Sequence, residues 1–310
     1  MKEAATRDAY GEALVEMGAD DTRIVVLDAG VSDSSRSKKF GDKYPNRFYN
    51  MGIAEADMVC TAAGLATTGK IPFATGFSCF LLGRTMDQIL VSIAYSNTNV
   101  KLVGTHTGLA VGEDGPSAQM IVDIAYTRAM PNLIVVQPAD WEETMQATRA
   151  LAEYAGPVYF RLGRPKVKGI FDGNYKFEIG KGRVVKKGAQ MVIFATGIMV
   201  QESLTAMEIL EKENISVTLV NISTLKPIDR KLIIEMVTNH EAILTAEDHN
   251  IIGGLGDAVG EVLLEEQISL PFKRIAVKDH FAETGTGPQL FEKYGLSANH
   301  IAQAVRDSLR

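Results

Sequence analysis

The feature that most constrains the fold is an alternation of short β-branched runs with longer helical stretches along the chain. Helices are predicted between most of the runs, because apolar residues recur near the 3.6-residue period in Ala54–Ala66 and Arg84–Tyr95. Such alternation is typical of a mainly parallel sheet covered by helices on both faces. The strands predicted in the first half are Arg23–Leu27, Phe48–Met51, Ile71–Ala74, Val100–Gly104, Leu133–Val136 and Val158–Phe160.

A second set of strands follows a break in this rhythm. The segment Arg161–Gly188 is rich in Gly and Lys and is predicted to be a connection, with a hairpin in Tyr175–Val185. Further strands are predicted at Met191–Thr196, Ser216–Asn221, Ala242–Glu247 and Arg274–Val277. The sequence therefore predicts an α/β protein of two consecutive α/β domains with mainly parallel sheets. We place the first domain in residues 1–165, a linker in 166–187 and the second domain in 188–310.

Composition and charge exclude several classes of function. With 46% hydrophobic and 23% charged residues the chain is typical of a soluble globular protein, and its net charge of -6 argues against a nucleic-acid or anionic-membrane surface. No apolar stretch reaches the roughly 18 residues that span a bilayer, and charges replace the apolar run of a signal peptide near the N-terminus. We therefore expect a cytoplasmic protein. Cys60 and Cys79 lack metal-ligand or redox spacing and are predicted to be buried thiols.

Polar and aromatic residues follow the predicted strands of the first domain. In open parallel sheets, ligands bind beyond the carboxyl ends of the strands. An acid, an aromatic platform, a histidine and two arginines on one edge suit an aromatic cofactor with a phosphorylated substrate. In chain order these residues are Asp28–Ser34, Glu55, Phe77, Phe80, His106 with the turn Gly112–Ser117, Arg161 and Arg164.

Several motifs in a fixed order resemble those of transketolase. ATRDAYGEAL, YPNRFYNMGIAEADMV, TGFSCF, GTHTGLAVGEDGPSAQM and YFRLGRP, within Thr6–Pro165, are similar to its pyrimidine-binding domain. LKPID and AEDHNIIGGLGDAVGE in the second half resemble its C-terminal domain. The GIAE motif alone is also similar to deoxyxylulose-phosphate synthase and to the β subunits of 2-oxo acid dehydrogenases.

The resemblance implies thiamine diphosphate as cofactor, with Mg²⁺. The family holds the diphosphate and the metal with a GDG motif and a later Asn in another domain. Here GEDG at Gly112 lies in a different context, and FDGN at Phe171 lacks the leading glycine. The few residues before Arg7 leave no room for that domain. We therefore expect a separate N-terminal transketolase subunit to carry the GDG motif in an α2β2 assembly, and no metal ligand in this chain.

The resemblance assigns Glu55 to the aminopyrimidine ring of the cofactor. Its carboxyl group, protonated or sharing a proton in a dry pocket, would bind a ring nitrogen and favour the imino tautomer that deprotonates the thiazolium carbon. Burial raises a carboxyl pKa as such a role requires. The alternative is a helix-start Glu stabilised by the helix dipole. Phe77 and Phe80 would pack on the same ring, although their spacing of three also suits core packing.

Four residues match the family's grip on the sugar phosphate: Arg7, Ser34, His106 and Arg164. Guanidinium groups give phosphate paired, charge-assisted hydrogen bonds. His106 is also a catalytic candidate. Each arginine could instead be a solvated surface residue, and His106 a satisfied core histidine. Arg161 either shares the phosphate or pairs with an acid.

The GEDGPS turn holds the remaining candidates. Asp114 resembles the acid that binds a hydroxyl of the donor ketose, although turns also place Asp beside Gly for backbone reasons. Ala118 stands where microbial transketolases have His, so we expect Gln119 to occupy that space, and Thr107 replaces the Asp of the family's THD motif. These departures leave the sugar specificity open.

The resemblance implies a ketol transferase of the pentose phosphate pathway, which moves a two-carbon unit from a ketose phosphate to an aldose phosphate. A deoxyxylulose-phosphate synthase-like or 2-oxo acid dehydrogenase β-like subunit is disfavoured by His106 with GEDGPS. A non-catalytic assembly partner is disfavoured by the retention of Glu55, Asp114, Arg7 and Arg164. His249 and His280 are predicted to be structural or interfacial.

Overall fold

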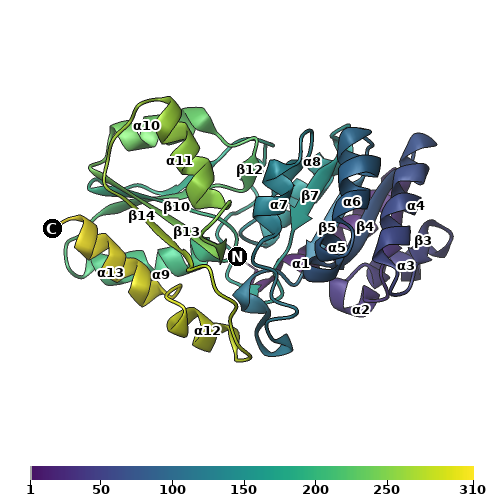
Figure 1. The fold of residues 1–310 in the computed structure, drawn as a ribbon, viewed down its shortest axis with the longest axis horizontal. Helices are drawn as coiled ribbons and strands as arrows, with labels where there is room; N and C mark the ends of the chain where they lie inside the picture. Colours follow the sequence, from purple (N-terminus) through teal and green to yellow (C-terminus); the bar gives the residue numbers. More distant parts are fainter. Residues whose placement is uncertain (1) are drawn as a thin grey trace.

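The computed structural model describes residues 2–310, and a seven-stranded sheet organises its first half (Figure 1). The strand order is β12-β6-β7-β5-β4-β2-β3, and only β12 runs antiparallel to its neighbour. The central strands are mostly apolar and buried over almost their whole length, as expected for a parallel sheet covered on both faces. The bounds are β2 Ile24–Asp28, β3 Phe48–Asn50, β4 Ile71–Phe77, β5 Lys101–Thr105, β6 Ile134–Val136, β7 Val158–Arg161 and β12 Thr224–Lys226.

Helices cover both faces of this sheet. One face packs around Tyr10, Phe73 and Phe160 and the other around Met58 and Leu102. The first face carries α1 (Thr6–Asp20), α3 (Lys38–Lys43) and α8 (Trp141–Glu153). The second carries α4 (Glu55–Thr67), α5 (Ser78–Gly83), the π-helix η2 (Ile89–Tyr95) and α7 (Asp123–Ala129). Shorter elements are β1 (Ala4–Ala5), α2 (Ser32–Ser35), η1 (Pro45–Arg47), α6 (Met86–Gln88), η3 (Leu109–Asp114) and β8 (Lys166–Val167).

A five-stranded sheet organises the second half, in the order β14-β13-β10-β11-β9. All its neighbours are parallel except β9 and β11. The strands are β9 (Arg183–Lys186), β10 (Met191–Ala195), β11 (Val217–Asn221), β13 (Ala242–Asn250) and β14 (Phe272–Val277). Figure 1 shows α10 (Arg230–Thr238) and α11 (Leu255–Glu265) on one face, with α9 (Met199–Glu211), α12 (Gly287–Lys293) and α13 (Ala298–Ser308) on the other side. None of the helices of residues 2–310 is long and apolar enough to cross a bilayer.

The two mainly parallel sheets, each covered by helices, confirm the predicted fold class, and every predicted strand is present with slightly shifted ends. The hairpin predicted in Tyr175–Val185 is wrong, because β9 pairs with β11 instead. The helix predicted over Arg84–Tyr95 is divided into α6 and η2. Cys60 is exposed and Cys79 only partly buried, so the prediction of two buried thiols is wrong. Cys60 follows the buried Met58 and Val59 on α4 and lies on the outer side of that helix.

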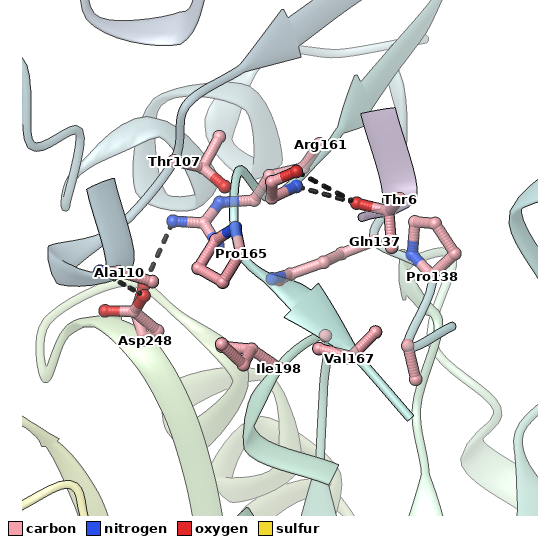
Figure 2. Close-up of a pocket in the computed structure, with 13 residues that line it drawn as sticks. Thr6, Thr107, Ala110, Gln137, Pro138, Arg161, Pro165, Val167, Ile198 and Asp248 are labelled. Carbon is pink, nitrogen blue, oxygen red and sulfur yellow. Dashed lines mark hydrogen bonds between the residues drawn. The ribbon is translucent and has the colours of Figure 1, made fainter. Parts of the chain in front are cut away.

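A buried ion pair in the first half holds an arginine that contacts the second half. Arg161 on β7 and Asp123 on α7 are 2.7 Å apart and almost inaccessible to solvent. Asp123 also accepts a hydrogen bond from Tyr159, while Arg161 donates to the backbone carbonyl of Asp248 in the second half. Figure 2 shows Arg161 and Asp248 at a cavity of about 20 Å³ between the halves, a volume that suits a single water molecule.

We predict that Asp123→Ala lowers the free energy of unfolding by about 3–5 kcal/mol, because it leaves the guanidinium of Arg161 buried without its partner. Urea denaturation measures the change. Glu261→Ala is the matched control, since it removes an acid from the pair with Arg128 at an exposed position, and it should cost below about 1 kcal/mol. Equal losses in the two variants would contradict a dominant role for the buried pair.

Candidate active site

The carboxyl ends of β2, β4, β5 and β7 lie at the same edge of the first sheet, since these strands are parallel neighbours. The first turn of α1, which carries Arg7, reaches this edge. Ser34 lies in the segment after β2, Phe77 ends β4 and His106 follows β5. The topology thus gathers residues that are far apart in the sequence.

An aromatic shelf lies at the end of β4. The ring centroids of Phe77 and His106 are 3.9 Å apart, and those of Phe77 and Phe80 are 6.2 Å apart with nearly parallel planes. Phe77 and Phe80 are both partly exposed. The two rings are therefore not wholly enclosed by the core.

His106 is a neutral imidazole in a strained backbone position. Its φ of 57° is left-handed, which is uncommon for a residue other than glycine. Arg7 Nη1 lies 2.9 Å from His106 Nε2, and because a guanidinium only donates, Nε2 must accept. Nδ1 then donates to Thr105 Oγ1 at 3.0 Å. Burial, together with the charges of Arg7, Arg164 and Arg36, lowers the pKa of His106 to about 3.

Three arginines concentrate positive charge beside this histidine. Burial and the charge of Arg36 lower the pKa of Arg7, whose Nε is buried without a hydrogen-bond partner. Arg7 Nη1 also donates to the carbonyl of Ser34 at 2.9 Å. Arg36 pairs with Asp8 at 2.6 Å, and Arg164 donates to the carbonyl of Val111 at 2.5 Å. The cluster has unfilled capacity for an anionic group.

Asp114 ends η3 close to the three arginines. Its side chain is exposed, and its charge raises the pKa of Arg7 against the effect of burial. The preceding residue, Glu113, pairs with Arg164 at 3.1 Å. Asp114 itself is thus an accessible acceptor at the edge of the basic cluster.

Glu55 is the first residue of α4 and only 5% exposed. Its Oε1 accepts a hydrogen bond of 2.8 Å from Arg84 Nη1, and the guanidinium of Arg84 lies 4.3 Å from the centroid of Phe80. A continuous row of contacts therefore leads from Glu55 through Arg84 to the aromatic shelf. The acid is buried and is connected to the shelf through Arg84.

Gln119 is buried below the η3 loop and serves as a bridge. Its Nε2 donates to the carbonyls of Gly112 at 3.3 Å and Glu283 at 3.1 Å, and its Oε1 is buried without a partner. Its amide nitrogen therefore holds the loop to the second half of the chain. A contact between Gln119 and substrate stays a prediction.

Sequence reasoning missed Arg36 and Arg84. Arg84 follows Phe80 by one helical turn, a spacing that could have indicated a contact. Arg36 lies just beyond the Asp28–Ser34 segment, but only the fold brings it to Arg7. Arg161 pairs with an acid, which was one of its two interpretations.

His249 and His280 of the second half lie apart from this row. His249 is buried at the seam, the contact between the two halves of the chain. Its Nε2 accepts a hydrogen bond from the backbone N–H of Ala125 at 3.4 Å. His280 is exposed and stacks near Tyr294, with centroids 5.1 Å apart. Among residues 2–310, no three His, Cys, Asp or Glu side chains are grouped as metal ligands.

Several known proteins are similar to this chain over nearly its whole length. A 1-deoxy-D-xylulose-5-phosphate synthase of Syntrophotalea carbinolica is 36% identical over 98% of this chain but only 48% of its own length. A Methanocaldococcus jannaschii protein, provisionally described as a transketolase C-terminal section, is 43% identical over 98% of this chain and 96% of its own length. A solved structure of a split-gene transketolase, described as an inactive β4 tetramer, is 45% identical with a TM-score of 0.92, and covers 99% of this chain and 98% of its own.

Two family models together match most of the chain. The transketolase pyrimidine-binding domain matches residues 2–169, and the transketolase C-terminal domain matches residues 180–301. These are the segments that contain the two sheets, and the shelf and the arginine cluster lie in the first. The chain therefore belongs to the transketolase family, as its pyrimidine-binding and C-terminal portion.

Proposed function

We propose that the chain is the C-terminal subunit of a split transketolase, which transfers a two-carbon ketol unit from a ketose phosphate to an aldose phosphate. The observation that carries the proposal is the contact row in which a buried acid, an aromatic shelf, a neutral histidine and a basic cluster meet at one sheet edge. The residues of this row would work only together with a second subunit.

The shelf fits the aminopyrimidine half of thiamine diphosphate. Phe77 and Phe80 offer partly exposed ring faces, and Glu55 offers a buried carboxyl group for a ring nitrogen. When bound, the cofactor supplies the nucleophilic carbon and the electron sink for carbon–carbon cleavage. Glu55 holds or shares a proton at the ring nitrogen. Arg84, whose side chain is 48% exposed, has room to turn outward and free that carboxyl group.

The basic cluster fits the phosphate of the sugar. Arg7, with its unpaired Nε, and Arg164 would bind the phosphate oxygens, together with Ser34. His106, neutral and fixed between Phe77 and Arg7, would belong to the same group of residues around the sugar phosphate. Asp114 would accept a hydrogen bond from a donor hydroxyl. Anchored at its phosphate, the ketose would have its carbonyl end directed to the shelf.

The diphosphate and Mg²⁺ are assigned to a partner subunit. The GDG motif of the family is not in this sequence, and no metal-ligand group is formed within residues 2–310. An N-terminal subunit with that motif would complete the site in an α2β2 assembly in the cytoplasm, in the pentose phosphate pathway. A relative of equal extent that is inactive as a β4 tetramer supports the requirement for a partner.

A synthase that consumes pyruvate is the second candidate. It is favoured by the 36% identity to a 1-deoxy-D-xylulose-5-phosphate synthase. The His106 and GEDGPS loop favours transketolase. We expect the chain, co-expressed with a GDG-containing subunit and supplied with thiamine diphosphate and Mg²⁺, to transfer two carbons from xylulose 5-phosphate. Either chain alone should be inactive. Pyruvate consumption without this transfer would replace the proposal with the synthase.

We predict that Glu55→Gln lowers kcat of the assembled enzyme by about 10²–10⁴-fold, because the amide cannot exchange a proton with the ring nitrogen. Steady-state two-carbon transfer measures the loss. Glu12→Gln is the control, since Glu12 pairs with Lys39 at an exposed position on α1, and its kcat should stay that of the wild type. A fully active Glu55→Gln enzyme would contradict the assigned role.

We predict that Arg7→Gln raises KM for a ketose phosphate by about tenfold or more, the cost of one charge-assisted hydrogen bond. KM for an unphosphorylated ketose should stay unchanged, because such a substrate carries no phosphate for Arg7 to bind. Arg149→Gln removes an exposed arginine paired with Glu16 and should affect neither KM. Equal increases for the two ketoses would show that Arg7 does not bind the phosphate.

A further inference from the structure

The second half of the chain holds the η3 loop through Asp248, a residue of β13 that is 1% exposed. Asp248 Oδ1 accepts a hydrogen bond from the backbone N–H of Leu109 at 2.7 Å, and Oδ2 accepts from that of Ala110 at 3.1 Å. Both carboxylate oxygens are therefore used on two successive amides of the first half. Figure 2 shows Asp248 reaching Ala110 across the seam.

Gly108 allows this approach. It has a φ of +71°, and a Cβ placed there would lie 2.1 Å from Asp248 Oδ2. Any other residue would collide with the carboxylate and strain the backbone. Glycine at position 108 therefore leaves the space that the carboxylate of Asp248 occupies.

Asp248 is itself held rigidly. Its backbone carbonyl accepts a hydrogen bond from Arg161 Nη2 at 3.0 Å, and Arg161 is fixed by Asp123. The next residue, His249, is fully buried. The carboxylate of Asp248 is therefore held in a fixed position, and it in turn holds the η3 loop.

The loop carries two groups that the proposed function assigns to the sugar. His106 lies three residues before Leu109 in its left-handed conformation, and Asp114 ends η3. Gln119 forms a second tie from the loop to Glu283, and α12 lies beside η3 (Figure 1). The second half of the chain therefore contacts the η3 loop at several points, through Asp248, Glu283 and α12.

We propose that Asp248 is a positioning residue for ketose recognition, which fixes His106 and Asp114 through the amides of Leu109 and Ala110. This inference rests on the proposed function, in which the loop binds the donor sugar. Asp248 touches neither cofactor nor substrate in it. The C-terminal domain thereby contributes to substrate binding without lining the site.

Glu247, the neighbour of Asp248, provides a matched control. It is equally buried, and its carboxylate also accepts two successive amides, those of Leu255 at 2.7 Å and Gly256 at 2.8 Å. These amides begin α11 within the second half. Glu247→Gln therefore breaks the same kind of interaction without touching the η3 loop.

Hydrogen exchange of the full chain, without a partner subunit, tests whether Asp248 holds the amides of Leu109 and Ala110. An Asn at position 248 cannot accept two N–H groups in this geometry, because one of its atoms is itself a donor. In Asp248→Asn the amides of Leu109 and Ala110 should exchange about tenfold faster or more, whereas in Glu247→Gln only those of Leu255 and Gly256 should. Unchanged exchange at Leu109 and Ala110 would overturn the proposal.

Kinetics of the assembled enzyme test the consequence. In Asp248→Asn, KM for xylulose 5-phosphate should rise about tenfold while the Kd of thiamine diphosphate stays within about twofold. Glu247→Gln should leave both values unchanged. Faster exchange with an unchanged KM, or an equal loss of cofactor affinity, would reduce Asp248 to a structural role and overturn the proposal.

A variant that does not fold and a failure of the proposed function can both be distinguished from a failure of this proposal. If Asp248→Asn does not fold, Gly108→Ala displaces the same contact from the first half, and the same exchange and KM changes are expected. If the wild-type complex transfers no two-carbon unit, the proposed function is wrong and the loop loses its assigned substrate. The exchange experiment then still decides whether Asp248 holds the loop.

Discussion

The buried ion pair of Arg161 and Asp123 is the interaction on which both halves of the site depend. Through Tyr159, which hydrogen-bonds both Asp123 and Ser78, the pair is connected to the residue that follows Phe77 of the shelf. Through Arg161 it fixes the backbone of Asp248. Since a buried charge is costly without its partner, the pair holds Arg161 in place, and Arg161 in turn connects the first half to the second. The shelf and the η3 loop thus share one rigid reference.

The positive charge at the sheet edge differs from the buried ion pair, because nearby acidic side chains compensate it only in part. Burial lowers the pKa of Arg7, and the positive charges of the nearby Arg36 and Arg164 lower it further. The acids Asp8 and Glu113 offset part of this repulsion. A bound phosphate would relieve the rest, so the chain's net charge of -6 conceals a site suited to an anion.

The sequence predicted the fold well because buried parallel strands are continuous apolar runs with clear ends. β12 escaped notice because its three residues carry no periodic signal and join the first sheet only through a distant contact with β6. Strand topology likewise predicted which residues would meet at one edge. It could not predict Arg84 on Glu55 or Arg36 near Arg7, because those contacts depend on side-chain directions that the spacing of residues does not fix.

The pair of Glu55 and Arg84 explains how a buried acid can be tolerated before its ligand is present. A carboxyl group that is 5% exposed needs a partner, and Arg84 supplies one from the surface, with about half of its own side chain in solvent. Under the proposed function a ring nitrogen takes over this contact when the second subunit and the cofactor arrive. The exposed side chain is the one that can move, whereas the acid is fixed at the start of α4. Under the proposed function, completion of the site would therefore require only an exchange of partners on a carboxyl group that is already in place.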